Sequence, residues 1–302
     1  MLKRDQLKKL EEFLSDRIIG QEESIKIISD AVLRAELGLR KIQRPKSGML
    51  LLGPTGVGKT EVVLSLAEFL YENLSRVKRF DMAEYQRQES LNWLLGADKT
   101  EQGLLGDAID ELNEEGGGIL LFDEIEKAHR SLTTIFLSAL DAGRITMSNG
   151  QTKNLSQFYI FFTSNLGGSN VAQMETSNHI TTRRCVEHCA RKYFSSELFA
   201  RFDEVVVFTR LSYPAQLGIC RRMLDGELDY LTKILGKKLK VSDNVFNFLI
   251  QKGYTKELGA RMMRSTIEKH IGNALVNWQL NANHNENDDI TITVENLQLV
   301  AL

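Results

Sequence analysis

A glycine-rich octapeptide, placed between an apolar run and a helical pattern, constrains the fold of this 302-residue chain more than any other feature. The apolar run covers residues 49–52, and the helical pattern covers residues 61–71. A strand, a glycine-rich loop and a helix in this order are typical of a phosphate-binding loop, whose backbone N–H groups face phosphate oxygens. The following helix adds the positive end of its dipole. The octapeptide consists of Gly53, Pro54, Thr55, Gly56, Val57, Gly58, Lys59 and Thr60.

The last two side chains of the octapeptide have specific predicted roles. Lys59 can reach the β- and γ-phosphates of a nucleotide, and the Thr60 hydroxyl can ligate Mg²⁺. The alternative is a glycine-rich turn that matches the pattern by chance. The strand before the loop and the helix after it favour the phosphate-binding interpretation.

Further apolar runs alternate with helical patterns along the first two thirds of the chain. The runs are nearly continuous, which is typical of a parallel sheet covered on both faces. The pattern predicts an α/β fold with a doubly wound, five-stranded parallel sheet and the phosphate loop after its first strand. The expected strands are residues 49–52, 77–81, 119–122, 158–163 and 204–208.

The pattern becomes mostly helical near Pro214, which suggests a helix start and a second, smaller domain. We expect three parts: a helical leader and linker, a large nucleotide-binding domain, and a small helix-rich domain with a closing strand at residues 290–294. In the leader, residues 2–14 predict one amphipathic helix, and a second helix follows from Glu22. The three parts are residues 1–47, 48–211 and 212–302.

Composition excludes several classes of protein. The net charge of −2 provides no general attraction to nucleic acid or to an anionic membrane. Three cysteines form no disulfide framework, so we expect a reducing, cytoplasmic environment. We also expect a bacterial protein. No apolar run approaches the length of a membrane span, and we expect no membrane partner.

Acidic and amide side chains end two of the predicted strands. Asp123 would hold Mg²⁺ through water, and Glu124 is placed to polarise an attacking water. Asn165 would orient that water near the γ-phosphate if its strand lies beside the first strand. The structural alternatives are a solvated acidic turn for the two carboxylates and a strand-end cap for Asn165.

Together these segments resemble an AAA+ ATPase, and specifically the second ATPase module of Clp/ClpB-type unfoldases. The resemblance covers nearly the whole chain, in order and at similar spacing. It implies ATP and Mg²⁺ as ligands. Besides the octapeptide with Glu61, the segments that carry it are residues 17–21 (RIIGQ), 80–85 (FDMAEY), 122–129 (FDEIEKAH), 140–146 (LDAGRIT), 163–167 (TSNLG), 201–208 (RFDEVVVF) and 259–261 (GAR).

The resemblance implies further nucleotide contacts. Ile18, Ile19 and Gly20 match the segment that packs near the adenine, and Glu61 closes the phosphate-loop motif. Arg261 matches the second sensor, which contacts nucleotide in the same subunit. An ordinary exposed helix residue is the structural alternative for Arg261.

The resemblance also implies an assembly. Asn165 matches the first sensor, and Arg201 matches the arginine finger, which reaches the neighbouring subunit's nucleotide and stabilises charge on the γ-phosphate. A finger supplied in trans requires an oligomer, and we expect a ring, a hexamer as in the family. From the residues alone, a surface ion pair of Arg201 with Asp203 or Glu204 is the alternative.

Two stretches depart from the family pattern. Residues 95–103 stand where threading members carry an aromatic loop that grips polypeptide, and they contain no aromatic residue. Residues 168–193 show no apolar tripeptide with a central glycine, so we expect no peptidase partner. The family's other modules are also missing, and we expect a stand-alone single ATPase module.

Three other features have open interpretations. Cys185, His188 and Cys189 share a helix face, where zinc with Cys220 as the fourth ligand competes with partly buried thiols. Trp93 and Trp278 are expected in the core. Neighbouring basic residues are either solvated or contact a partner or nucleic acid, and they are Arg183, Arg184, Arg191 and Lys192.

Our first functional hypothesis is an ATP-hydrolysing ring ATPase that remodels or moves an unidentified protein partner, without a conventional aromatic pore loop. A second hypothesis gives the same motor a nucleic acid, as in transposition, conjugation or replication. The charge balance argues against it. A third hypothesis is an ATP-dependent switch that scaffolds a larger machine.

Overall fold

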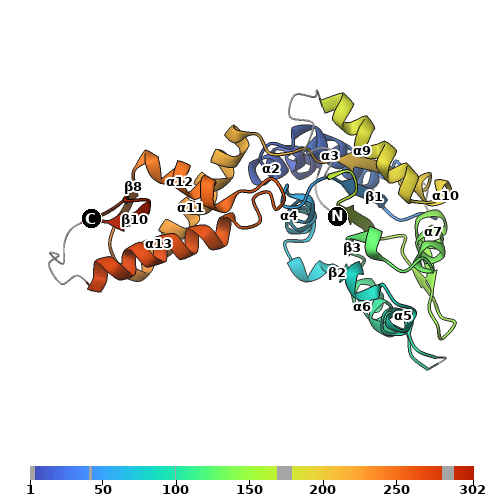
Figure 1. Ribbon diagram of the computed structural model, residues 1–302. Coiled ribbons are helices and arrows are strands. Elements are labelled where there is room, and N and C mark those ends of the chain that lie inside the picture. Colours follow the sequence, from blue (N-terminus) through green and yellow to red (C-terminus); the bar gives the residue numbers. More distant parts are fainter. Residues whose placement is uncertain (1–3, 41–42, 99, 169–178, 281–288) are drawn as a thin grey trace. The chain divides into compact units, whose positions relative to one another are not determined.

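The computed structural model describes residues 4–40, 43–98, 100–168, 179–280 and 289–302. The chain divides into two compact units (Figure 1). The first unit contains Met1–Pro54 and Gly58–Thr209, and the second contains Thr55–Val57 and Arg210–Leu302. Among the described helices, none combines the length and apolar character that a bilayer crossing requires.

The first unit is built on a five-stranded parallel sheet with the strand order β2-β3-β6-β1-β7. This arrangement confirms the predicted α/β fold with a doubly wound parallel sheet. Because neighbouring strands run the same way, the C-terminal ends of β3, β6 and β1 meet at one edge. The strands are β1 (Ser47–Leu52), β2 (Val77–Asp81), β3 (Ile119–Asp123), β6 (Tyr159–Ser164) and β7 (Glu204–Val207).

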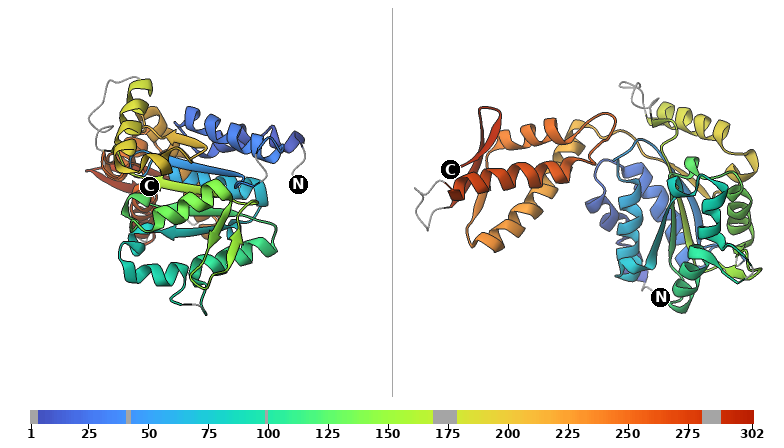
Figure 2. Two further views of the ribbon diagram at one scale, coloured as in Figure 1. Left: turned by 90° about the vertical axis from the view of Figure 1, so that its right-hand side faces the viewer. Right: turned by 60° about the horizontal axis from the view of Figure 1, so that its bottom comes forward.

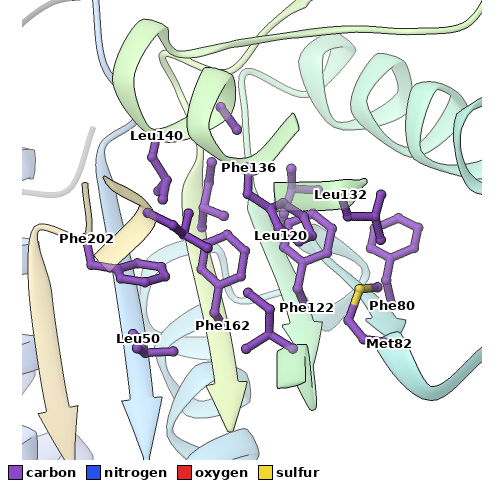
Figure 3. Packing of buried hydrophobic residues seen from close by; sticks show 14 of the residues in the cluster. Leu50, Phe80, Met82, Leu120, Phe122, Leu132, Phe136, Leu140, Phe162 and Phe202 are labelled. Carbon is purple, nitrogen blue, oxygen red and sulfur yellow. The ribbon is translucent and has the colours of Figure 1, made fainter. Parts of the chain in front are cut away.

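One face of this sheet carries a large aromatic core (Figure 3). Phe122 and Phe162 lie opposite each other in the register of β3 and β6, so their side chains point to the same face of the sheet. Their ring centroids lie 5.2 Å apart, and Phe136 of the covering helix α7 lies 5.0 Å from Phe162. The helices that contribute to this core are α5 (Gln88–Leu95), α6 (Gly103–Glu114), α7 (Leu132–Ala142), α9 (His179–Tyr193) and α10 (Ser196–Phe199).

The opposite face is covered by helices from the start of the chain and by the helix after the phosphate loop (Figure 2). Helix α3 (Glu22–Glu36) packs on β1 and β7, and α4 (Lys59–Tyr71) packs on β3 and β6. Helix α2 (Leu10–Arg17) packs on both α3 and α4. With helices on both faces, the sheet is buried as its continuous apolar strands require.

The prediction of one helix over residues 2–14 is wrong for the described part of that segment. It contains α1 (Arg4–Leu7) and α2, separated by a turn at Lys8 and Lys9. The Lys9 N–H donates to the Gln6 carbonyl at 3.0 Å. This bond spans three residues and closes a tighter turn than the four-residue bond of an α-helix. The turn changes the helical phase while Leu7, Leu10 and Leu14 all remain buried.

Short elements connect the strands of the first unit. A hairpin of β4 (Arg144–Thr146) and β5 (Thr152–Asn154) was not predicted, because three residues are too few to show alternation. The 3₁₀ turns are η1 (Leu74–Arg76), η2 (Met82–Tyr85) and η3 (Ile125–Lys127).

The second unit is rich in helix, as predicted. Ser212 caps its first helix through a hydrogen bond from the Ala215 N–H at 3.4 Å, and Pro214 lies in the first turn. The predicted closing strand is present as β9, which pairs with β8 and β10 in a small sheet. The elements are α11 (Tyr213–Leu235), β8 (Leu239–Val241), α12 (Asp243–Gly253), α13 (Met263–Leu280), β9 (Ile290–Glu295) and β10 (Gln298–Ala301).

The two tryptophans have opposite environments. Trp278 is 9% exposed, which confirms its predicted place in a core. Trp93 is 70% exposed, so its prediction is wrong. Leu91 and Leu94 lie three residues apart and face the core, whereas Trp93 lies on the other side of the same helix.

Candidate functional site

The glycine-rich octapeptide adopts a backbone that glycine favours. Gly53, Gly56 and Gly58 have φ angles of 141°, 70° and 108°. A Cβ atom on Gly53 would also lie 2.4 Å from the Phe208 carbonyl oxygen, so no larger residue fits there. The loop ends at Lys59, where α4 begins. The N-terminal N–H groups of this helix are therefore available to an anion at the loop.

Lys59 is held inside the loop with only 8% of its surface exposed. Its Nζ donates to the carbonyl oxygens of Gly53 and Pro54, both at 2.7 Å, and to Asn165 Oδ1 at 3.0 Å. Burial lowers the pKa of Lys59 to about 8, against the attraction of carboxylates at Glu126, Asp123 and Glu124. The loop thus places a cation of reduced pKa beside three acidic side chains.

Asp123 and Glu124 are organised by Thr163, which lies on the neighbouring strand β6. Thr163 Oγ1 donates to Asp123 Oδ1 and accepts the Glu124 N–H at 3.0 Å. Arg79 Nη2 lies 2.5 Å from Asp123 Oδ2, and Lys127 pairs with Glu124 Oε2. Glu124 has φ of 57°, a left-handed conformation that costs energy for a residue with a side chain. The two carboxylates are therefore oriented by specific partners.

Asn165 joins the phosphate loop to the acidic strand end. Its strand β6 lies between β1 and β3, which places its side chain between Lys59 and Glu124. Asn165 Oδ1 accepts from Lys59 at 3.0 Å, and Asn165 Nδ2 donates to Glu124 Oε1 at 3.2 Å. The structure therefore brings together Lys59, Asp123, Glu124 and Asn165, which the sequence singled out separately.

Glu126 belongs to the same cluster, although the sequence did not identify it as a site residue. Its Oε1 accepts the Asn165 backbone N–H at 3.0 Å, and its backbone oxygen accepts from the Tyr193 hydroxyl. Its Oε2 is buried and has no hydrogen-bond partner among the described residues. The signal that the sequence offered for Glu126 is its position three residues after Asp123. The 3₁₀ turn η3 then returns the chain toward the ends of the strands.

We expect Glu126→Ala to lower the free energy of unfolding by about 1 kcal/mol, because the Asn165 N–H would lose its acceptor in a partly buried environment. Glu126→Gln retains an oxygen acceptor and should lose less. Denaturant unfolding of both variants measures the difference. Equal stability of the alanine variant and the unmodified protein would contradict the assigned contact.

The segment predicted to lie near the adenine contacts the end of the phosphate loop. Ile18 is 4% exposed, and its Cγ2 would lie 3.2 Å from a Cβ on Gly58. Ile19 follows it and is partly exposed. The Gln21 side chain holds this segment by pairing with both backbone groups of Thr209, at 2.8 and 3.0 Å. Thr60 is partly exposed in the first turn of α4, and Glu61 is exposed.

Arg201 lies at the opposite edge of the sheet from the phosphate loop. It precedes β7, and Asp203 beside it donates its N–H to Gly48 at the start of β1. Lys59 follows the end of β1, a strand of six residues, so the two edges are roughly 20 Å apart. Arg201 pairs at 3.6 Å with Asp141, whereas the alternative partners considered from the sequence have other contacts.

Arg261 lies in the second unit, in an exposed turn before α13. The turn is closed by a bridge between Thr255 and Gly259. Residues 55–57 of the phosphate loop group with this unit, and the Gly56 carbonyl accepts the Ala260 N–H at 3.0 Å. This hydrogen bond holds Ala260, the residue before Arg261, against Gly56 of the loop.

Of the other candidate features, the cysteine cluster and the basic residues of α9 lie in the described part of the chain. Among the described residues, no cluster of His, Cys, Asp or Glu has a metal-binding arrangement, and the thiols of Cys185 and Cys189 are partly exposed. On α9, Arg183 pairs with Glu187 at 2.7 Å, and Arg191 lies 4.2 Å from the Phe199 ring centroid. Residues 169–178, within the stretch considered for peptidase docking, lie outside the described part of the chain.

The chain matches known proteins along nearly its whole length. Residues 44–205 match the family described as AAA domain (Cdc48 subfamily), and residues 215–292 match the C-terminal, D2-small domain of ClpB protein. Heat shock protein 100 of Trypanosoma brucei brucei is 36% identical over 281 residues, which cover 89% of this chain and 31% of that protein. Chaperone protein ClpB of Rickettsia typhi is 36% identical over 304 residues, which cover 98% and 35%.

A solved structure gives the same match in three dimensions. The closed state of Hsp104 with ATPγS and FITC casein has a TM-score of 0.85 and 30% sequence identity. The match covers 99% of this chain and 52% of the Hsp104 chain. This chain therefore spans about a third of the length of its curated relatives and about half of the solved one.

Proposed function

Because this chain belongs to the AAA ATPase family and contains a ClpB-type small domain at residues 215–292, we propose that it hydrolyses ATP as a subunit of a ring, a hexamer, and uses the energy to remodel or move a protein partner. The observation that carries the proposal is the Asn165 side chain, which contacts both Lys59 and Glu124. One amide thus ties the cation expected at the phosphates to the carboxylate expected at the attacking water.

The phosphate loop would bind the triphosphate through backbone N–H groups of residues 53–60 and through Lys59. The Thr60 hydroxyl and the Asp123 carboxylate are oxygen ligands of the kind that Mg²⁺ prefers, so the site fits this ion. Mg²⁺ would neutralise charge on the phosphates when bound. The contacts of Thr163 and Arg79 with Asp123 would keep its carboxylate oriented.

Glu124 would accept the proton of the water that attacks the γ-phosphate, and Asn165 would orient that water. In the structure, Glu124 Oε1 already accepts from Asn165, and Lys127 holds the other oxygen. Ile18 and Ile19 would contact the adenine, and Arg261 would contact the phosphates. For Arg201, its place at the far edge of the sheet supports action on a neighbouring subunit's nucleotide.

A polypeptide is the partner class that the comparisons favour, because a matched Hsp104 structure contains casein. The loop at residues 95–103 lacks an aromatic residue, so we propose that this chain does not use the family's aromatic pore loop. We also propose that this chain acts without a peptidase partner. No observation favours nucleic acid over polypeptide, since the described contacts engage Arg183 and Arg191 within the chain.

Lys59→Ala is expected to lower the affinity for ATP by at least about tenfold, equivalent to 1.4 kcal/mol, because the triphosphate would lose its buried cation. Equilibrium titration with a fluorescent ATP analogue measures the change, and circular dichroism checks the fold. Lys26→Ala, at an exposed lysine of α3, is the matched control. Equal affinity in both variants would contradict the role of Lys59.

The partner class is tested by the steady-state rate of phosphate release from the full chain. We expect unfolded casein to increase the rate. Stimulation by single- or double-stranded DNA, decreasing as salt is raised, would instead support the nucleic-acid function. Binding of ATP without measurable hydrolysis under all these conditions would support the scaffold and contradict the proposed motor.

A further inference from the structure

Trp93 and Leu104 are large apolar side chains that the first unit leaves exposed, at 70% and 55%. Trp93 lies near the end of α5, and Leu104 lies at the start of α6. Both line a surface hollow of about 780 Å³, together with Asn149 and Gln151 from the turn of the β4–β5 hairpin. Figure 1 shows α5 and α6 side by side at one end of this unit.

The walls of the hollow are held by backbone contacts. Gly103 has φ of 67°, and a Cβ there would lie 2.3 Å from the Gly96 nitrogen, so the two ends of the connecting loop touch. The Ser148 N–H donates to the Leu95 carbonyl at 3.0 Å, which fixes the hairpin against α5. These contacts fix the end of α5 that carries Trp93, and the described residues leave the Trp93 side chain exposed.

The polar lining of the hollow is acidic. Its described residues include the carboxylates of Glu101 and Asp107 and contain no lysine or arginine. Asp98 lies in the same loop outside the lining, where hydrogen bonds from Thr100 lower the pKa of its carboxyl, and Lys99 beside it lies outside the described residues. At the rim, the exposed amide of Asn92 offers both a donor and an acceptor.

We propose that this hollow binds an extended polypeptide segment bearing a lysine or arginine, with the cation over the Trp93 ring and facing Glu101 and Asp107. An aromatic face attracts a cation, and a tryptophan gives large contact area at low entropic cost. The amide of Asn92 can pair with a peptide main chain, and the carboxylates repel a phosphate backbone. The inference rests on the proposed action upon a protein, and it names the surface and the chemistry that receive the protein.

Peptide binding by the full chain tests the proposal. The probe is a fluorescein-labelled peptide of alternating lysine and serine, followed by anisotropy. Trp93→Ala should weaken its binding roughly tenfold or more, as removal of a central aromatic anchor does. Tyr230→Ala removes an aromatic that is 59% exposed in the second unit, and should leave binding unchanged. Equal affinity in both variants, or no binding by the unmodified chain, would overturn the proposal.

Trp93 also reports directly on its own environment, because the chain contains two tryptophans. In Trp278→Phe, Trp93 is the remaining emitter, and the lysine peptide should protect its fluorescence from acrylamide. If this variant does not fold, the difference between the unmodified chain and Trp93→Phe gives the same signal. Unprotected Trp93 emission at saturating peptide would overturn the proposal even if the peptide binds elsewhere.

Charge reversal and nucleic acid complete the test. A glutamate–serine peptide should bind the unmodified chain at least about tenfold more weakly than the lysine peptide does. The lysine peptide should also bind the double variant Glu101→Gln, Asp107→Asn at least about tenfold more weakly than it binds the unmodified chain. Binding of a DNA oligonucleotide that depends on Trp93 would overturn the proposal in favour of nucleic acid. Casein stimulation of ATP hydrolysis that is unchanged in Trp93→Ala would refute this surface and leave the proposed function intact. The absence of casein stimulation in the unmodified chain would instead refute the proposed function.

Discussion

Arg201→Ala is expected to lower the rate of ATP hydrolysis by roughly 10³–10⁵-fold, because the guanidinium would no longer stabilise charge on a neighbouring subunit's γ-phosphate. The variant should still bind ATP, since Arg201 lies at the opposite sheet edge from its own phosphate loop. Phosphate release and nucleotide titration measure the two effects separately.

The matched control for Arg201 is Arg44→Ala. Arg44 Nη2 lies 2.7 Å from Asp141 Oδ1, the same atom that Arg201 approaches at 3.6 Å. Both substitutions therefore remove a partly exposed ion pair, whose own contribution to stability is small. Only the loss of Arg201 should affect catalysis. Similar rates in the two variants would show that Arg201 has a structural role.

Mixing variants tests whether the action is between subunits. An Arg201→Ala subunit retains Glu124, and a Glu124→Gln subunit retains Arg201, so a mixed ring contains interfaces with both groups. We expect mixtures to recover part of the lost hydrolysis, in proportion to such interfaces. Mixtures with rates that equal the weighted mean of the pure variants would contradict the assignment in trans.

Glu124→Gln is expected to abolish most ATP turnover, by about 10²–10⁴-fold, while ATP remains bound. An amide cannot accept the proton of the attacking water. Its oxygen can still accept from Asn165 Nδ2, so the arrangement around the loop should persist. Single-turnover phosphate release gives the rate of chemistry, and equilibrium titration gives the affinity.

Glu114→Gln provides the control for Glu124, because Glu114 is an exposed glutamate at the end of α6. It should hydrolyse ATP at the unmodified rate. Turnover in Glu124→Gln at the rate of this control would remove Glu124 from its proposed role. A loss of ATP binding as well would show that the substitution disturbs the phosphate loop rather than the chemistry.

The parallel sheet was predictable because its signals are local. Continuous apolar runs such as residues 49–52 and 119–122 are typical of strands buried on both faces, and they are bounded by glycine or by an acidic residue. The strands β4, β5, β8 and β10 have three or four residues, too few for a periodic signal, and they were not predicted. Their positions depend on partners distant in the sequence.

The sequence by itself determined the chemistry available at the ends of β1, β3 and β6: a lysine, two carboxylates and an amide, each placed by a local motif. Only the tertiary structure decided which groups meet. Strand order put Asn165 between Lys59 and Glu124, and brought Glu126 to the Asn165 backbone.

Tertiary packing also decided which side of α5 faces water. It placed Trp93 in solvent, although Leu91, Leu94 and Leu95 surround it in the sequence. The physical reason is that a motif specifies residue types along one segment, whereas a contact between segments depends on how strands and helices pack across the whole unit.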